Sequence, residues 1–198
     1  MRWRRCGEDA ALLECDSLDR MRAAHATVLA ARPPEVVDLV PGARSLLVVG
    51  GVAAVRALLE AADLAHPPSA EPREVTLDVR YDGEDLALIA ADAGVSPDAV
   101  VSMHTEAVYA VAFTGFAPGF GYLTGLPEPL RQPRLETPRT RVPAGSVGLA
   151  GEFTGVYPRE SPGGWRLLGH TSATLFDPHA DPPALFAPGD RVRFRRVR

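Results

Sequence analysis

The sequence predicts an α+β protein made of two parts, a small α+β unit followed by an all-β barrel. Two observations carry this prediction. Residues 1–65 alternate short apolar strands with two segments of helical periodicity, whereas the chain from residue 108 onward contains short strands punctuated by glycine and proline. Between the parts, three prolines within His66–Pro72 predict an extended, semi-rigid linker. We therefore expect domains at 1–72 and 73–198.

The N-terminal unit is expected to begin with two short strands around a turn. Its predicted elements are strands at 2–4 and 10–13, a helix at 18–31, strands at 36–40 and 45–49, and a helix at 52–64. Ser17 is a suitable N-cap for the first helix, which Pro33 and Pro34 end. The order strand, helix, strand, strand, helix fits a small ferredoxin-like α+β unit.

The second part is expected to begin with one strand and two short helices. Its predicted elements are a half-buried strand at 75–81, a helix at 86–93, a short helix that starts at Pro97, a strand at 108–113 and a last strand at 191–198. Asp85 and Ser96 are suitable N-caps for the two helices, and Gly94 can end the first of them. Residues 114–190 are predicted to form strands and turns only, which indicates an irregular β-barrel.

Charge and residue usage exclude several kinds of function. All 21 basic residues are arginine, so the chain has neither a lysine for a Schiff base nor the lysine of a Walker A nucleotide site. The net charge of −4 and the lack of basic patches interleaved with aromatics argue against nucleic acid as a partner. No apolar run approaches the roughly 18 residues of a membrane span. We expect a cytoplasmic protein that makes no membrane contact.

Metal and disulfide chemistry are not expected. Cys6 and Cys15 are the only cysteines, and the eight residues between them match no metal-ligand spacing. A reduced pair fits the usage of cysteine in cytosolic proteins. The histidines also form no cluster with metal-ligand spacing, so we predict no metal site.

Residues 113–165 are the most informative stretch of the chain. They contain ten of the 18 glycines and eight of the 19 prolines, a density that excludes a helix. Aromatic residues run through the whole stretch, whereas disordered segments are poor in them. The stretch is therefore predicted to form a rigid β surface of tight turns. Several polar residues lie among its rings: Arg134, Arg139, Arg141, Ser146 and Arg159.

Several short words of sequence stand in a fixed order in the second part. They are Gly115–Phe120 with Tyr122–Leu123, Pro138–Arg139 with Val142–Val147, Gly151, Tyr157–Pro158, Ser161–Trp165, Leu175–Asp177 and Pro188–Phe194. In order and spacing, these words resemble the bacterial family variously called the 5-oxoprolinase B-type subunit (PxpB), kinase A inhibitor (KipI) and allophanate hydrolase subunit 1. The resemblance covers roughly residues 75–198 and implies a cyclophilin-like β-barrel for this part.

The resemblance also implies a function. It indicates a subunit of an ATP-dependent 5-oxoprolinase, which opens 5-oxoproline to glutamate, and it implies a larger homologous C-type subunit and a separate A-type subunit as partners. Because the chain lacks a phosphate-binding lysine, it would contribute one wall of an ATP site shared with a partner. Two alternatives stay open under the same family names. One is a KipI-like inhibitor of a sensor histidine kinase, and the other is a subunit of an allophanate hydrolase or urea carboxylase.

His104, Arg139 and Arg141 are the candidate catalytic residues. A histidine at the end of the second short helix can handle protons if it faces a cleft, or it can satisfy helix carbonyls. Arg139 and Arg141 flank Thr140, so in an extended segment they share one face. Two guanidiniums on one face can bind a carboxylate or a phosphate, or they can pair with carboxylates of the chain itself.

The candidate substrate-binding residues come from the aromatic and glycine-rich turns and from the words of the resemblance. They are Phe116, Pro118, Phe120, Tyr122, Pro143, Gly145, Ser146, Tyr157, Gly163, Gly164, His170 and Thr171. Ser146 is expected to donate a hydrogen bond and not to act as a nucleophile, because no Gly-x-Ser-x-Gly word surrounds it. Gly121 and His170 depart from the family pattern, which usually has proline and arginine there. Trp165 is expected in the barrel core or in a subunit contact.

Overall fold

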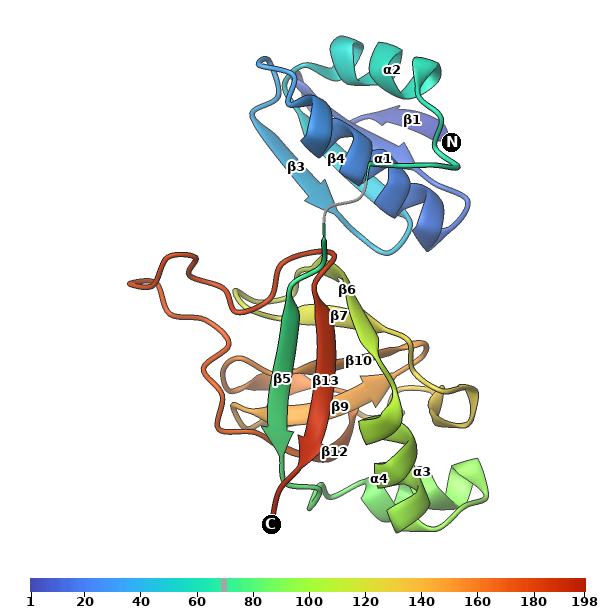
Figure 1. Cartoon of the computed structure of the whole chain (residues 1–198), viewed down its shortest axis with the longest axis vertical. Coiled ribbons are helices and arrows are strands. Elements are labelled where there is room, and N and C mark those ends of the chain that lie inside the picture. Colours follow the sequence, from blue (N-terminus) through green and yellow to red (C-terminus); the bar gives the residue numbers. More distant parts are fainter. Residues whose placement is uncertain (69–70) are drawn as a thin grey trace. The chain divides into compact units, whose positions relative to one another are not determined.

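The chain folds into two compact units, Met1–Glu71 and Pro72–Arg198, in a computed structural model that describes residues 1–68 and 71–198 (Figure 1). The sequence places the limit between the domains after residue 72. Ser69 and Ala70 of the predicted linker lie outside the described residues. Each unit has its own hydrophobic core and is described by itself.

The N-terminal unit is a four-stranded antiparallel sheet with two helices. Its elements are β1 (Arg2–Arg5), β2 (Ala10–Glu14), α1 (Leu18–Ala31), β3 (Asp38–Pro41), β4 (Ser45–Val49) and α2 (Val52–Ala61). The strands follow the order β1-β2-β4-β3. From β2 to α2 the chain has the ferredoxin-like order, and β1 supplies the fourth strand beside β2. The predicted elements are all present, and the second helix ends at Ala61 instead of residue 64.

The alternation of side chains along the strands decides which face of this sheet is buried. Leu13, Leu46 and Val48 are fully buried and share one core with residues of both helices, whereas their neighbours along the strands are partly exposed. The side chain of Ser17 caps α1, as predicted, by accepting a hydrogen bond from Arg20 N at 3.1 Å. Full burial of each large apolar side chain contributes about 1.5–3 kcal/mol, so these rows hold the helices on the sheet.

The C-terminal unit combines a curved seven-stranded sheet with two helices and a two-stranded ribbon. Its elements are β5 (Glu74–Val79), α3 (Leu86–Ala93), α4 (Pro97–Glu106), β6 (Tyr109–Thr114), β7 (Gly121–Thr124), η1 (Glu128–Leu130), β8 (Arg139–Val142), β9 (Ser146–Ala150), β10 (Phe153–Val156), β11 (Ser161–Gly163), β12 (Arg166–His170) and β13 (Arg191–Arg196). The prediction of strands and turns only after residue 113 is wrong at η1, which is a short 3₁₀ helix. The α+β class is confirmed.

The large sheet is a nearly closed barrel. Its strands follow the order β12-β9-β10-β7-β6-β13-β5, in which β13 and β5 pair in parallel and the other neighbours are antiparallel. Arg80 and His170 join the two ends of the sheet by exchanging backbone hydrogen bonds of 2.9 Å in both directions. Figure 1 shows β5 and β13 in front of β9, β10 and β12. The barrel predicted from the punctuated strands is thus present, and β8 and β11 form the separate ribbon.

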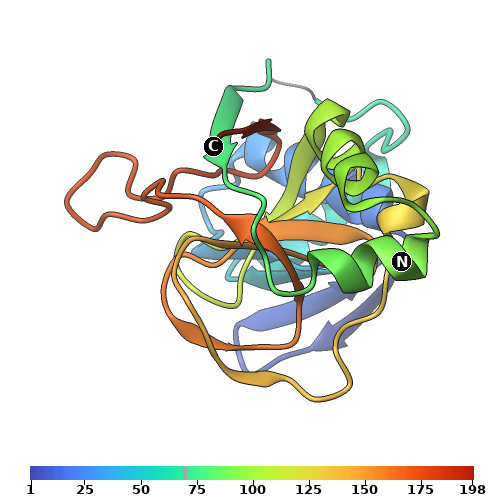
Figure 2. The same cartoon turned by 90° about the horizontal axis from the view of Figure 1, so that it is seen from below.

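The barrel interior is filled by alternating apolar residues. In β5 the side chains of Val75, Leu77 and Val79 are buried and the residues between them are exposed, which is the predicted half-buried pattern. Ile89 of α3 and Val100 of α4 are fully buried in the same core, so both short helices pack on the barrel. Figure 2 shows that the long loop between β12 and β13 extends away from the strands.

Glycine permits the close contact between the ends of the barrel sheet. A Cβ at Gly169 would lie 2.0 Å from Arg80 O, and a Cβ at Gly83 would lie 2.3 Å from Leu167 O. Real Cβ atoms do not approach carbonyl oxygens this closely, so only glycine lets the two backbones meet.

Asp85 lies next to this contact and has a role that the sequence did not predict. It occupies the N-cap position of α3, but its side chain makes no cap hydrogen bond. Its carboxylate instead accepts hydrogen bonds from Leu167 N at 2.7 Å and from Arg139 Nη2 at 2.8 Å. The prediction that Asp85 caps the helix is therefore wrong, and the side chain ties the start of α3 to β12 and β8.

Within residues 1–68 and 71–198, no helix is long and apolar enough to cross a bilayer by itself. Only α3 and α4 taken together reach that length and composition, and they are bent by 90°.

Candidate functional site

The turn between β6 and β7 places an aromatic side chain on the barrel surface. Ala117 N donates to Gly115 O at 2.7 Å, which makes a tight γ-turn with Phe116 at its centre. Phe116 has a φ of 66°, in the left-handed region that bulky residues rarely adopt. As a result its ring is 58% exposed, although the ring belongs to a large apolar side chain. Strain of this kind is often found at functional sites.

Phe116 lies at the edge of a cleft of about 440 Å³, here called the aromatic cleft. The cleft is lined by Phe116, Phe120, Tyr122, Pro133, Arg134, Ala150, Gly151, Phe153, Tyr157, Gly163 and Trp165. The ring of Phe120 lies at the centre of the cluster and makes edge-to-face contacts with Tyr122, Tyr157 and Trp165, with centroid distances of 5.0 to 5.6 Å. Contacts of this geometry fix the orientation of each ring, so the wall of the cleft is preorganised.

Two glycines make room for these rings. A Cβ at Gly155 would lie 3.1 Å from the ring of Phe120 and 3.2 Å from that of Trp165. A Cβ at Gly163 would lie 2.3 Å from the hydroxyl oxygen of Tyr157. The mixture of glycine and aromatic residues in this stretch therefore has a direct cause, since the rings pack on bare backbone.

The polar side-chain groups of the cleft are two tyrosine hydroxyls, the indole N–H of Trp165 and one guanidinium. Burial raises the pKa of Tyr122 and of Tyr157, and the positive charge of Arg134 opposes the rise in both. Both hydroxyls therefore stay protonated at neutral pH and can donate hydrogen bonds. Arg134 is the one charged residue of the lining, because no carboxylate is part of it.

The cleft brings together part of the predicted substrate-binding set. Phe116, Phe120, Tyr122, Tyr157 and Gly163 line it. Pro118 lies instead in an adjoining groove, between the β6–β7 turn and the loop around residues 182–188. Phe116 lines both hollows, so its ring forms the ridge between them.

The other predicted binding residues lie outside the cleft lining. Gly145 N donates to Tyr157 O at 2.7 Å and Thr171 N donates to Gly145 O at 2.9 Å, so this turn is used to join strands. Ser146 and Thr171 are buried. Their role in binding stays a prediction, and the same holds for Pro143 and Gly164.

His170 lies where the two ends of the barrel sheet meet, away from the aromatic cleft. Its side chain is half exposed, and its Nδ1 lies 2.8 Å from Asp82 Oδ1. The predicted contact of His170 with substrate also stays a prediction. In the structure His170 has a structural role, because its pair with Asp82 links β12 to the segment that follows β5.

His104 is completely buried in the barrel and both of its ring nitrogens have partners. Thr154 Oγ1 donates to Gly148 O at 2.9 Å, so it accepts from His104 Nε2–H at 3.0 Å. His104 Nδ1 consequently carries no proton and accepts from the Tyr81 hydroxyl at 2.7 Å. Burial lowers the pKa of His104 from 6.5 to about 3, so the ring is neutral at physiological pH. Its catalytic role stays a prediction, and in this conformation the ring could reach a substrate only through its partners.

Arg139 and Arg141 are close in sequence but have different surroundings. Arg139 Nη2 lies 2.8 Å from Asp85 Oδ1, and its Nη1 is buried without a hydrogen-bond partner in the described chain. Arg141 is largely exposed and its Nε lies 2.6 Å from Glu160 Oε2. Each guanidinium is thus already engaged by a carboxylate. The anion site predicted for this pair stays a prediction.

The lining of the cleft decides whether a metal ion or a nucleotide fits it. Among the residues that the structure describes, no group of three or more His, Cys, Asp or Glu side chains could hold a metal. A nucleoside triphosphate needs several cationic or backbone donors and a carboxylate or hydroxyl for its Mg²⁺. With one guanidinium and no carboxylate, the cleft does not fit such a group by itself.

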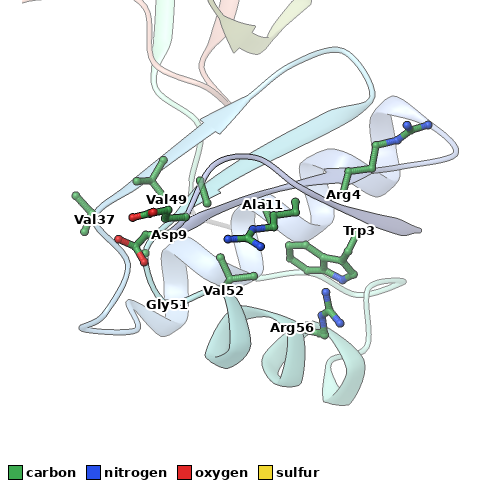
Figure 3. A pocket seen from close by; sticks show the side chains of 13 residues that line it. Trp3, Arg4, Asp9, Ala11, Val37, Val49, Gly51, Val52 and Arg56 are labelled. Carbon is green, nitrogen blue, oxygen red and sulfur yellow. The ribbon is translucent and has the colours of Figure 1, made fainter.

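The N-terminal unit contains a second cavity, of about 570 Å³, between the β1–β2 hairpin and the start of α2 (Figure 3). Its lining combines arginines with the carboxylates of Glu8 and Asp9. The guanidinium of Arg56 lies over the ring of Trp3, 5.2 Å from its centroid, and covers that ring. Because this cavity has both signs of charge and holds no predicted site residue, we take the aromatic cleft as the candidate site.

The comparison with known families decides the affiliation of the chain. The carboxyltransferase domain family, subdomains C and D, matches residues 1–186. The chain belongs to this family. The B-type subunit of the 5-oxoprolinase of Escherichia coli O157:H7 is 44% identical to this carboxyltransferase-family chain over 173 residues, which are 81% of the chain and 78% of that subunit. The family indicated by the sequence words is thereby confirmed.

Two of the solved structures with the same fold are longer than this chain. The crystal structure of TTHA0988 superposes with a TM-score of 0.79 and 37% identity, and the match covers 96% of this chain but 40% of TTHA0988. The urea amidolyase of K. lactis superposes with a TM-score of 0.73 over 98% of this chain and 15% of its own length. At 20% identity the second likeness shows the fold alone.

Six residues of the cleft lining were not predicted to belong to the site, and three of them have large side chains: Arg134, Phe153 and Trp165. The sequence places Arg134 among the rings without marking it as a binding residue, and Trp165 was expected in the core or in a subunit contact. Trp165 is in fact 7% exposed and lines the cleft, so it belongs to the core and to the site. Phe153 belongs to none of the sequence words on which the family resemblance rests. Arg134 could have been found from its surroundings in the sequence, because it lies in the aromatic stretch and neither of its direct neighbours is acidic.

Proposed function

We propose that this chain is the B-type subunit of a 5-oxoprolinase and takes part in the opening of 5-oxoproline to glutamate. The observation that carries the proposal is its close similarity, along most of its length, to the B-type subunit of a 5-oxoprolinase. The aromatic cleft supports it, because it is a preorganised hollow on the unit in which the family words cluster. The cleft is then the place where the chain contacts the substrate.

The same proposal includes partners and ATP. The chain lacks a lysine for phosphate, and its cleft does not fit a nucleoside triphosphate alone. Phosphate-binding groups must then come from another chain, which agrees with partners of the A type and the C type. TTHA0988 supports the idea of a companion polypeptide, since the matched region is 40% of a longer chain there. The assembly is expected in the cytoplasm.

The alternatives suggested by the family names have weaker support. The likeness to urea amidolyase is one of fold, so it does not carry urea-derived substrates to this chain. Inhibition of a histidine kinase would need a protein-binding surface, for which the groove beside Pro118 is the available place. Neither alternative has a comparison at the identity that supports the oxoprolinase.

The proposal is tested with the assembled complex. The chain is co-expressed with A-type and C-type subunits, and ADP release is followed with and without 5-oxoproline. We expect ADP release that requires both 5-oxoproline and this chain. A complex that assembles and stays folded, yet shows no ADP release dependent on 5-oxoproline, would rule out this substrate and direct the search to urea-derived acids.

A further inference from the structure

The arginines near the aromatic cleft differ in whether a carboxylate neutralises them. Arg139 pairs with Asp85 at 2.8 Å, and Arg141 pairs with Glu160 at 2.6 Å. Arg134 is exposed, and its side chain makes no ion pair or hydrogen bond with any residue that the structure describes. All of its donors are therefore available to a ligand in the cleft.

The backbone on both sides of Arg134 is tied to the barrel. Gly151 N donates to Gln132 O at 2.7 Å, and Leu135 N donates to Gly164 O at 2.8 Å. A Cβ at Gly164 would lie 3.6 Å from Arg134 Nε, so the guanidinium lies close against this glycine. These contacts hold Arg134 at the mouth of the cleft without using its charge.

The surroundings of Arg134 favour an anion with an apolar body. The rest of the lining is aromatic or apolar, apart from the protonated hydroxyls of Tyr122 and Tyr157. A ligand packed against these walls excludes water from the guanidinium, which strengthens the ion pair relative to one in bulk water. A guanidinium can hold both oxygens of one carboxylate, and flat rings can pack on a small flat ligand.

We infer that Arg134 is the specificity-determining residue of the cleft, and that the cleft selects small rings that carry a carboxylate over the same rings without one. The inference rests on the proposed function for the identity of the ring, a five-membered cyclic amide. Arg134 holds the carboxylate, and the hydroxyl of Tyr122, which also lines the cleft, is a donor for the amide oxygen. The carboxylate-paired Arg139 and Arg141 do not set this preference.

A binding experiment compares two ligands that differ by the carboxylate alone. 5-Oxoproline and 2-pyrrolidinone share the lactam ring, and only the first carries the acid. In a Trp3→Phe background, Trp165 is the only tryptophan and lies in the cleft, so its fluorescence reports occupancy. We expect the full chain to prefer 5-oxoproline about tenfold or more, and Arg134→Gln to remove the preference.

A kinetic experiment asks the same question of the assembled complex. Arg134→Gln is expected to raise KM for 5-oxoproline about tenfold or more. Arg134→Lys should raise KM less, because lysine keeps the positive charge but lacks the planar pair of N–H donors. Arg195→Gln is the matched control, since it removes one exposed, carboxylate-paired arginine from the same unit, and it is expected to leave KM unchanged. Inhibition by 2-pyrrolidinone should be the same in wild type and Arg134→Gln.

The outcomes separate this inference from the proposed function. If the complex turns over 5-oxoproline and Arg134→Gln changes neither KM nor the ligand preference, the inference is wrong and the proposed function stands. If the chain binds 5-oxoproline through Arg134 but the complex never releases ADP in response, the proposed function is wrong and the inference stands. If Arg141→Gln raises KM for 5-oxoproline more than Arg134→Gln does, the carboxylate site belongs to β8 and the inference is wrong. Absence of both binding and turnover overturns both statements.

Discussion

The barrel contains two polar clusters that differ in whether their polar groups have hydrogen-bond partners within the chain. The inner cluster consists of His104 with Tyr81, Tyr109 and Thr154, and each of these side chains has a hydrogen-bond partner within the barrel. The outer cluster consists of Tyr122, Arg134 and Tyr157 in the aromatic cleft. Its guanidinium has no partner among the described residues, although aromatic rings surround it.

The difference between the clusters shows where a ligand can act. A buried polar group without a partner costs about 1–3 kcal/mol, so the inner cluster has to be complete within the chain. In the outer cluster Arg134 is exposed to solvent and avoids that cost, which leaves its donors free for a ligand. A histidine and three hydroxyls are attractive as catalytic residues by type, yet it is the arginine without a partner that is available for binding.

The largest effect is expected on breaking the inner cluster. His104→Ala should lower the free energy of unfolding of the barrel by about 3–4 kcal/mol, because it leaves a cavity and removes the partners of Tyr81 and Thr154. Urea unfolding, followed by Trp165 fluorescence in the Trp3→Phe background, measures the barrel alone. His179→Ala, an exposed control, should change little. A loss below about 1 kcal/mol for His104→Ala would mean that the inner cluster is not structural.

A smaller effect is expected from the ion pair that joins α3 to β8. Asp85→Ala should cost roughly 2–3 kcal/mol, because Arg139 and Leu167 N lose their acceptor while Arg139 keeps a little exposure to water. Glu160→Ala removes the partner of the exposed Arg141 and should cost less than about 0.5 kcal/mol. Equal losses in the two variants, measured by the same urea titration, would contradict the distinction between buried and exposed pairs.

The pH dependence of stability tests whether His104 of the inner cluster stays neutral in the folded barrel. The folded pKa of His104 is about 3 and its ordinary value is 6.5, so below pH 6.5 the unfolded chain binds a proton that the folded chain does not. This contribution is complete above pH 6.5 and is lost as pH falls toward 3, by up to about 1.4 kcal/mol per pH unit. His104→Gln should therefore show a flatter decline of unfolding free energy over this range than wild type. Parallel declines would show that His104 is protonated in the folded barrel.

The smallest effect on stability is expected in the outer cluster. Tyr122→Phe should change the free energy of unfolding by less than about 0.5 kcal/mol, because its ring contacts with Phe113 and Phe153 remain. Under the proposed function the same change should weaken binding of 5-oxoproline several-fold, as one hydrogen bond is lost. Trp165 fluorescence measures the second effect. A large loss of stability without a loss of binding would place Tyr122 in the core and not in the site.

Most of the fold could be predicted from the sequence. The helix from Leu18 to Ala31 has a cap, a periodic face and terminating prolines, and its limits are the predicted ones. The alternation of apolar and polar residues predicted the strand that the structure shows as β5. The role of Asp85 was missed because a cap is a local pattern, whereas its actual partners lie on β12 and β8, far along the chain.

The site was predictable only in part, for a related reason. Aromatic residues among glycines indicated the cleft, since residue type and local density are visible in sequence. Residues distant in sequence decide whether an arginine is paired, as Asp85 does for Arg139. The sequence alone does not show which distant residues the fold brings together. The burial of His104 has the same origin, because Tyr81 and Thr154 approach it from different strands and loops.

The parallel pairing of β5 with β13 also sets the order in which the chain can fold during synthesis. Each strand of the N-terminal sheet has its neighbours within residues 2–49, so this unit can form soon after it leaves the ribosome. β5, at Glu74–Val79, pairs with Arg191–Arg196, so it waits until more than a hundred further residues have been made. During that interval its apolar row of Val75, Leu77 and Val79 has no strand to pair with, so the nascent barrel exposes apolar surface for longer than the N-terminal unit does.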